Sequence, residues 1–460
     1  MHMPPGPPQG PILSCDPGEQ LRQLRRLLDP QRWPLPVGLL PPGTVLVGGA
    51  VRDALLGQSC ERPDLDFVVM GDAVALARDL ARRSGGSCVV LDRERSIARL
   101  VLAGWSFDLA RCCGASLAED LLRRDYGINA IALSLESLLG LDQAGPIDPA
   151  GGLEDLRRGE LRALAEANLL ADPLRLLRGL RLAGQLGFRL ESRTQGWIRQ
   201  HHQQLATVAG ERVLAELERL VAAPAALPAL ALSLDLGLLE PWGGGGASAR
   251  GPVALLSGAR AQCCGLSAQE AERALPLARL AALLPPESLG RLRASRRLQQ
   301  RLTRLRHWRQ RLEALAVALA LEPAPERASP AAAASLPCGV LEALPEPERL
   351  ALQQQLEEDL PSLVLHLDPA EATACLRRWR DPADPLFHPR SPLDGSTLQR
   401  QLQLQPGPIL GQLQAFLCAE QAFGRLAAAA EPAQAVALAR RWLAERGGSV
   451  AASPADGPVA

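Results

Sequence analysis

Hydrophobic and polar positions follow a strand, helix, strand order early in the chain. Val45 to Val47 form a short apolar run that predicts a buried strand. Two glycines follow, and residues 50–56 predict a short helix that ends at Gly57. A polar loop then leads to Asp64-Leu65-Asp66 and a second apolar run, residues 67–70. The pattern therefore predicts two strands around a helix, with two acidic residues where the second strand begins.

About a third of the way along the chain, alternating helix and strand signals give way to helical signals alone. A helical stretch at 73–83 is followed by strand-like runs at 88–91, 97–102 and 105–109, which together indicate a small α/β domain reaching about residue 147. Beyond it we find almost no strand signal, and Leu, Ala and Arg recur at helical spacing between clusters of Pro and Gly. The predicted fold class is α+β, with an N-terminal α/β head followed by an all-α remainder.

Composition shifts and Pro/Gly clusters divide the chain into six expected segments. The first is a Pro-rich lead-in with one helix, and the last is a stretch of small and polar residues expected to be disordered. The expected segments are the lead-in at 1–43, the head at 44–147, a helical neck at 148–225, a helical body at 226–385, a helical tail at 386–445 and the disordered end at 446–460.

Composition excludes several classes of protein. The 50 acidic and 50 basic residues balance, and every basic residue is Arg, whose planar fork suits phosphate oxygens. Ten cysteines occur without any CxxC pair, so a zinc site is not expected, and reduced thiols favour a cytoplasmic location. No uncharged apolar run reaches the roughly 18 residues that a membrane span needs.

Asp64 and Asp66 are the first candidates for chemistry. Side chains two positions apart on a strand point to the same side, roughly 7 Å apart. Two carboxylates so placed suit Mg²⁺, and Mg²⁺ shared with substrate phosphates is the usual requirement of phosphoryl transfer. Gly48-Gly49 would let the backbone approach a phosphate closely, near the positive end of the following helix.

These motifs resemble a known family. Gly-Gly-x-Val-Arg-Asp-x-Leu-Leu-Gly at 48–57, followed by Asp-x-Asp at 64–66, is similar to the head of class II tRNA nucleotidyltransferases and bacterial poly(A) polymerases. The resemblance implies a polymerase-beta-like nucleotidyltransferase head, with Asp64 and Asp66 as catalytic ligands of two Mg²⁺ ions. It also implies that Gly49 and Arg52 bind the phosphates of the incoming nucleotide.

Two later motifs extend the resemblance. Residues 120–130 resemble the family's Asp-Leu-x-Arg-Arg-Asp-Phe-Thr-Ile-Asn-Ala element, with Tyr126-Gly127 in place of Phe-Thr; this implies that Arg124, or alternatively Arg123, binds the triphosphate. The segment from Ala171 resembles the Glu-Asp-x-x-Arg element, with Ala in place of Glu. The resemblance implies that Asp172 and Arg175 read the edge of the incoming base. It also implies that Arg178 and Arg181 bind phosphate.

The resemblance implies an enzyme that adds C and A residues to the 3′ end of tRNA from CTP and ATP, without a template. A Pro-Gly-Pro motif at 406–408 resembles the tail of the tRNA-specific members and favours them over poly(A) polymerases, which implies that the tail at 386–445 binds RNA. Addition of CC alone or of A alone stays open, because the region where the family carries its flexible specificity loop is compact here. The alternative to an enzyme is an inactive RNA-binding protein with the same fold.

Three further features carry open interpretations. Asp108, on a neighbouring predicted strand, is a candidate third carboxylate. The segment 210–217 resembles the family's last neck motif and is expected to be structural. Residues 291–311 carry nine Arg and no acid, which indicates either a solvated helix face or a contact with the RNA backbone.

Overall fold

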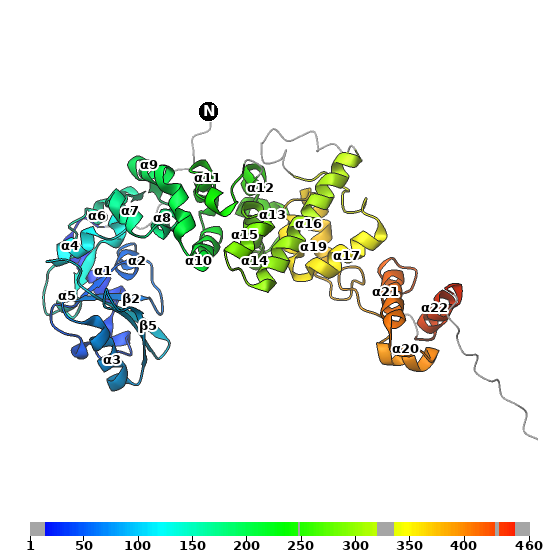
Figure 1. The fold of residues 1–460 in the computed structure, drawn as a ribbon, viewed down its shortest axis with the longest axis horizontal. Coiled ribbons are helices and arrows are strands. Elements are labelled where there is room, and N and C mark those ends of the chain that lie inside the picture. Colours follow the sequence, from blue (N-terminus) through cyan, green and yellow to red (C-terminus); the bar gives the residue numbers. More distant parts are fainter. Residues whose placement is uncertain (1–13, 247–248, 320–334, 428–431, 447–460) are drawn as a thin grey trace, which may run out of the picture. The chain divides into compact units, whose positions relative to one another are not determined.

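A computed structural model describes residues 14–246, 249–319, 335–427 and 432–446 (Figure 1). The chain divides into two compact units, Met1–Gly245 and Gly246–Ala460. The first thirteen residues of the expected lead-in and nearly all of the expected disordered end lie outside the described residues. Among the residues that are described, no helix combines the length and the apolar character needed to cross a membrane.

A six-stranded mixed sheet forms the centre of the first unit, in the order β3-β4-β5-β2-β1-β6. β2 and β5 run parallel, and the other neighbouring pairs run antiparallel. The α+β class is confirmed, although β6 was not expected from the sequence. The strands are β1 (Val45–Val47), β2 (Leu65–Val69), β3 (Ser87–Asp92), β4 (Ile97–Leu102), β5 (Trp105–Arg111) and β6 (Ala132–Ser134).

The turn between β1 and the first helix of the head depends on Gly48. This residue has φ +78°, in the left-handed region that glycine adopts readily. It follows the fully buried strand β1 and leads directly into α2 (Gly49–Leu55). The predicted strand, glycine turn and helix are therefore present, and they bring the start of α2 to the end of a central strand.

Helices surround this sheet and continue into the neck. α11 (Ala226–Asp235) opens the segment that we expected to be the body, but it packs on α8 (Leu174–Leu186) and α10 (Gly210–Val221) and belongs to the first unit. β7 (Glu160–Leu161) and β8 (Arg189–Leu190) form a short parallel pair in a region that we expected to lack strands. The helices are α1 (Pro17–Leu27), α3 (Ala73–Ser84), α4 (Leu117–Leu122), α5 (Leu135–Leu138), α6 (Gly152–Arg158), α7 (Glu166–Ala171), α8 (Leu174–Leu186), α9 (Ser192–His201), α10 (Gly210–Val221) and α11 (Ala226–Asp235).

Tyr126 joins the head to helix α8. Its side chain is fully buried, and its hydroxyl donates a 2.8 Å hydrogen bond to the carbonyl oxygen of Arg175. A Cβ on Gly179, one turn further along α8, would lie 2.1 Å from the Tyr126 hydroxyl oxygen. The tyrosine in place of the family's phenylalanine is thus accommodated by a glycine in the facing helix.

The second unit is helical throughout its described residues. α20, α21 and α22 enclose their own apolar cluster, which includes Leu398, Leu413 and Trp442. The helices are α12 (Arg250–Leu255), α13 (Gly258–Cys263), α14 (Ala268–Leu283), α15 (Pro286–Arg291), α16 (Arg296–Ala318), α17 (Glu346–Leu356), α18 (Leu360–Val364), α19 (Pro369–Trp379), α20 (Gly395–Leu402), α21 (Pro408–Ala422) and α22 (Pro432–Glu445).

Several arginines of α16 bind other residues of the second unit. Arg301 forms an ion pair with Asp359, and Arg311 forms one with Glu348 of α17. Arg306 donates to the carbonyl oxygens of Ala281 and Leu284 where α14 ends. These contacts use part of the basic content of α16 to hold neighbouring helices of the unit together, and the solvated-face and RNA-contact interpretations stay predictions for its other arginines.

We predict that Gly179→Ala destabilises the protein. Alanine favours a helix over glycine by up to about 1 kcal/mol, but overpacking a core typically costs about 1–3 kcal/mol, so the clash with Tyr126 should dominate. The midpoint of denaturant unfolding, followed by circular dichroism, measures the change. Gly196→Ala in α9 is the matched control, because nothing lies within 4 Å of the place that its new Cβ would take, and it should leave stability equal or raised. Equal behaviour of the two variants would contradict the packing argument.

Candidate active site

The two predicted acidic residues lie where β2 begins. Asp64 directly precedes β2, and Asp66 is its second residue, in register with Val47 on β1 and Asp108 on β5. A Cβ on Gly48 would stand 3.0 Å from Asp66 Oδ2 and 3.9 Å from Arg124 Nη1. Glycine at position 48 therefore lets the turn pass close to the carboxylate of Asp66, which any side chain there would crowd.

A cavity of about 360 Å³ opens in front of these residues. It brings together side chains from the head and from α8 of the neck, which lie more than a hundred residues apart in the sequence. Leu27 and Leu28 from the lead-in also line it, which the sequence did not indicate. The predicted site residues in its lining are Gly49, Arg52, Asp64, Asp66, Arg178 and Arg181.

The electrostatics of the cavity centre on Asp66. Burial raises the pKa of Asp66 to about 6, and the neighbouring charge of Asp108 acts in the same direction, against the lowering effect of Arg124 and Arg178. Burial and a neighbouring negative charge both disfavour the ionised form of a carboxyl group, and a cation beside it stabilises that form. The raised pKa therefore indicates a position at which positive charge would be stabilised.

Of the two adjacent arginines, Arg124 is the one directed toward this carboxylate. Its Nη2 donates to Asp120 over 3.1 Å, and its Nε is buried with no hydrogen-bond partner. Arg123 instead is exposed and donates to Cys113 Sγ over 3.0 Å. The Nη1 of Arg124 lies on the side of Gly48, so this guanidinium group is the one placed to meet an anionic ligand such as a phosphate.

Asp108 lies next to Asp66 but is already bound. Arg99 on β4 donates to both of its carboxylate oxygens, over 2.7 and 2.8 Å. Among the residues that the structure describes, no three His, Cys, Asp or Glu side chains converge closely enough to hold a metal ion by themselves. Asp64 and Asp66 are oxygen donors of the kind that Mg²⁺ prefers, and the cavity that they line leaves room for the substrate phosphates that usually complete its shell.

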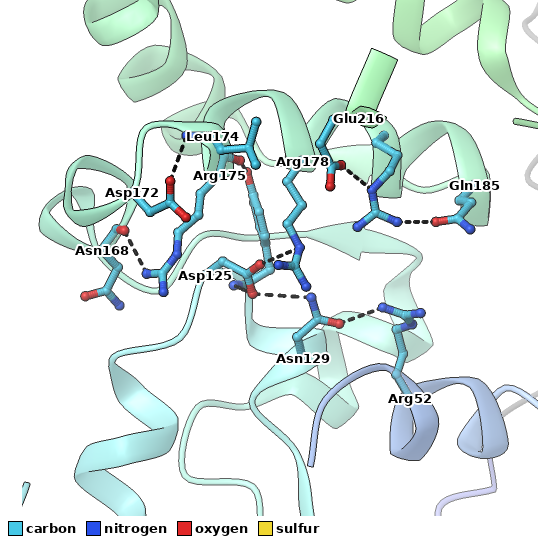
Figure 2. A network of polar contacts seen from close by, with 12 residues as sticks. Arg52, Asp125, Asn129, Asn168, Asp172, Leu174, Arg175, Arg178, Gln185 and Glu216 are labelled. Atoms are coloured by element: carbon cyan, nitrogen blue, oxygen red, sulfur yellow. Dashed lines mark hydrogen bonds and ion pairs between the residues drawn. The ribbon is translucent and has the colours of Figure 1, made fainter. Parts of the chain in front are cut away.

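A chain of polar contacts connects the neck helix to the head (Figure 2). Arg178 of α8 forms an ion pair with Asp125 over 3.1 Å, Asp125 accepts from Asn129 over 3.3 Å, and Asn129 accepts from Arg52 of α2 over 2.6 Å. Burial by itself would raise the pKa of Asp125, but Arg178, Arg175 and its hydrogen bonds outweigh burial and hold that pKa below its usual value. Asp125 is therefore a buried anion that joins two cationic side chains of the cavity.

Arg181, one turn after Arg178, is held in place by the neck itself. Its Nε donates to Glu216 of α10 over 2.6 Å, and its Nη1 donates to Gln185 (Figure 2). Burial lowers the pKa of Arg181, and Glu216 opposes that effect. The side chain of Arg181 is 11% exposed and that of Arg178 is 46% exposed, so Arg178 has more freedom to contact a ligand.

Asp172 and Arg175 lie near each other where α8 begins, but they do not line the cavity (Figure 2). Asp172 accepts from the backbone of Leu174 over 3.3 Å and forms a 2.9 Å ion pair with Arg212 of α10. Arg175 donates to the backbone oxygens of Arg123 and Asn168. In this arrangement both predicted base-reading side chains are bound to other parts of the protein.

Several residues of the site were not assigned from the sequence. Asp125 and Asn129 stand inside the motif at 120–130, so the motif itself was the available signal. Arg212 lies in the segment at 210–217 that we expected to be structural, and its contact with Asp172 adds a link to the candidate site. Arg99 carried no local signal, because its pairing with Asp108 depends on the strand register.

Family comparisons agree with this geometry. Residues 44–112 and 108–162 match the family described as "Poly A polymerase head domain", and residues 187–242 match "Probable RNA and SrmB- binding site of polymerase A". A "CC-adding tRNA nucleotidyltransferase" of Synechocystis sp. is 44% identical over 212 residues, which are 46% of this chain and 50% of that protein. An "A-adding tRNA nucleotidyltransferase" of Deinococcus radiodurans is 40% identical over 215 residues, 46% of each chain.

The matches to these relatives thus span about half of their length. A solved structure, "The complex structure of CCA-adding enzyme with CTP", aligns with a TM-score of 0.67 over 94% of this chain and 98% of that one, at 21% identity, which shows a shared fold. The head motifs, the sheet that carries them and these matches all indicate the same family. The chain belongs to the class II tRNA nucleotidyltransferase and poly(A) polymerase family.

Proposed function

We propose that this protein is a template-independent nucleotidyltransferase that adds nucleotides of the CCA end to tRNA, using CTP or ATP and Mg²⁺. The observation that carries the proposal is the cavity in which Asp64 and Asp66 meet Gly49 and the arginines of α8. Its place in the cytoplasm is inferred from composition alone. The relatives supply the choice of tRNA as the substrate, since the cavity by itself fits any nucleoside triphosphate.

Each residue then has a part in the reaction. Asp64 and Asp66 would hold Mg²⁺, which when bound lowers the pKa of the RNA 3′ hydroxyl and offsets the charge of the triphosphate. The 3′ oxygen attacks the α-phosphorus, and pyrophosphate leaves. Arg124, whose Nη1 lies on the side of Gly48, and the backbone at Gly48 and Gly49 would receive phosphate oxygens.

The arginines of the cavity wall would divide two tasks. Arg178 is exposed enough to turn toward a phosphate, while Arg52 and Arg181 are held by Asn129 and Glu216 and would supply fixed positive charge. Fixed charge of this kind stabilises a transition state without reorganisation at the moment of reaction. All three would thus bind the triphosphate side of the nucleotide.

Asp172 and Arg175 would read the base. A carboxylate accepts from an exocyclic amine, which cytosine and adenine carry and uracil lacks, and a guanidinium donates to a ring nitrogen or carbonyl. To do so, Asp172 must be free to face the base while Arg212 holds it from the other side. Base choice would then reside in the protein, without a nucleic-acid template.

Within this activity we propose addition of CC rather than of the whole CCA end. The strands β3 and β4 are joined by only four residues, 93–96, in the region where the family carries its flexible specificity loop. The similarity to the CC-adding enzyme of Synechocystis sp. supports the same choice. Addition of A alone is the second candidate, because the A-adding relative is nearly as similar.

One set of incubations tests these alternatives. Transfer RNA lacking three, two or one of its terminal nucleotides is incubated with labelled CTP or ATP separately. CC addition predicts two residues from CTP on the shortest RNA and none from ATP on any. If only the RNA that lacks one nucleotide is extended, and only by ATP, the enzyme adds A alone. Use of both triphosphates would indicate full CCA addition. No product from any combination would indicate an inactive RNA-binding protein.

We predict that Asp64→Ala and Asp66→Ala each reduce nucleotide addition at least about a hundredfold in a folded protein, because a missing ligand leaves the triphosphate charge without its counter-ion. Mg²⁺ should raise the melting temperature of the unaltered protein and have little effect on either variant. Asp79→Ala on α3 is the control, since Asp79 forms ion pairs with Arg82 and Arg83 on the surface of that helix. Near-normal turnover in both cavity variants would exclude this site.

We predict that Asp172→Ala relaxes the preference for CTP over UTP more than it slows addition. Arg212→Ala should shift base choice in the same direction but less, because it frees the Asp172 side chain without removing it. The ratio of kcat/KM values for the two triphosphates measures both effects. Arg199→Ala on the exposed side of α9 serves as the control. An unchanged ratio in Asp172→Ala would remove this residue from base selection.

A further inference from the structure

A row of four side chains crosses the sheet of the head from the acidic pair outward. Its members are in register on four neighbouring strands, β2, β5, β4 and β3, and they are Asp66, Asp108, Arg99 and Val89. Residues in register on neighbouring strands point to the same face of a sheet. Since β3 is an edge strand, the row connects the candidate catalytic centre to the edge of the sheet.

The face that carries this row is open on β4 and β3. α3 packs on β4, and two residues of β4 that alternate with Arg99, Ala98 and Leu100, are fully buried, so Arg99 points away from α3. Exposure increases along the row, because the side chain of Asp108 is 24% exposed, that of Arg99 is 42% exposed and Val89 is 50% exposed. The row therefore forms a surface that a further molecule can reach.

Arg99 is held in the row by one edge of its guanidinium group. Its Nε and Nη2 donate to the two carboxylate oxygens of Asp108, over 2.7 and 2.8 Å. A bidentate pair of this kind fixes the plane of the guanidinium group. The third nitrogen, Nη1, has no hydrogen-bond partner among the residues that the structure describes. Arg99 can therefore donate from Nη1 to a ligand while Asp108 keeps the side chain in place.

The position of Arg99 relative to the cavity indicates which substrate it can meet. The cavity in front of Asp66 is lined by α2 and α8, and its lining does not include Asp108 or Arg99. In the proposed reaction the triphosphate lies in that cavity, and the attacking oxygen and the leaving pyrophosphate lie on opposite sides of the reacting phosphorus. An RNA end that approaches over β5 and β4, on the side of Asp66 away from β1, meets this requirement.

We propose that Arg99 binds the phosphodiester that joins the last two nucleotides of the RNA, with the end of the strand lying along this row. Nη1 would donate to a phosphate oxygen, and the apolar side chain of Val89 would contact the sugar or base of the preceding nucleotide. A phosphate contact at this point positions the 3′ hydroxyl beside Asp64 and Asp66. The inference rests on the proposed function, because it takes RNA as the molecule that is extended.

Binding of two synthetic RNA hairpins to the full chain tests the proposal. Both reproduce a tRNA acceptor stem without its CCA end and carry a fluorescent label in the loop. They differ only in the last linkage, which is a phosphodiester in one and an uncharged methylphosphonate in the other. Fluorescence anisotropy with Mg²⁺ and without a triphosphate gives the dissociation constants. We expect about tenfold tighter binding of the phosphodiester hairpin, the difference that one charged hydrogen bond makes.

Arg99→Met should bind both hairpins equally, because it removes the group that distinguishes them. A merely structural role of Arg99 predicts otherwise, since partial loss of folding would weaken both hairpins by the same factor and preserve their ratio. Arg82→Met on α3 is the matched control, because Arg82 is an exposed arginine on the helix that packs on the other face of the sheet. It should keep the tenfold ratio.

Val89→Asp provides a second variant, at an exposed position of the edge strand where folding should not suffer. The new carboxylate would stand in register with Arg99 and repel the RNA backbone. It should therefore weaken binding of the phosphodiester hairpin more than that of the methylphosphonate hairpin. Equal affinity of the unaltered protein for the two hairpins, or an unchanged tenfold ratio in Arg99→Met, would overturn the proposal.

The outcome is separable from that of the proposed reaction, because binding is measured without turnover. Asp64→Ala should keep the tenfold ratio although it should not extend RNA. A protein that extends no RNA would contradict the proposed function, and its affinities for the two hairpins would still test the role of Arg99. An active enzyme with equal affinities would contradict only the role of Arg99.

Discussion

The buried carboxylate of Asp125 is the contact on which the candidate site depends. It lies between the sheet of the head and the first turns of α8, and it bonds Arg178 on one side and Asn129 on the other. A buried charge is tolerated only when it is paired and hydrogen-bonded, and here the partners come from both parts of the unit. The cavity before Asp64 and Asp66 has its cationic wall because this anion holds that wall in position.

The local elements of the head could be predicted because their signals are local. The run Val45 to Val47, the glycine turn and the acidic pair at Asp64 and Asp66 each occupy adjacent residues, and the structure contains them. β6 escaped prediction because Ala132, Leu133 and Ser134 include no β-branched or aromatic residue to favour a strand, and it exists through its pairing with β1. The same holds for the two-residue pair β7 and β8, which depends on a distant partner strand.

Pairings between distant residues account for most of what the sequence did not reveal. Asp108 stays a candidate third carboxylate, but the sequence did not reveal that the register of β4 against β5 sets Arg99 opposite it. Asp172 and Arg212 are forty residues apart and meet only because α8 and α10 pack together. Arginine content in α16 likewise gave no sign of its partners, which are carboxylates and helix-end carbonyls of the same unit.

A protein whose cations are all arginine can use them as internal connectors. Arg260 donates to the backbone oxygens of Leu365 and Leu367, and Arg279 donates through two nitrogens to that of Leu256. A guanidinium group can serve several acceptors at once in a fixed plane, which a lysine ammonium does not match. Although the net charge of the chain is zero, many of its arginines thus bind acceptors inside the fold.

The close approach of Tyr126 to Gly179 restricts the order in which this protein can change. Alanine at 179 would improve the helix, yet it is barred while a phenol occupies the space, and phenylalanine at 126 would still leave the ring in the way. The two positions must therefore alter together or in a fixed succession, with the aromatic residue made smaller first. Whether a substitution is tolerated at one of these two positions thus depends on the residue at the other, although they lie far apart in the sequence.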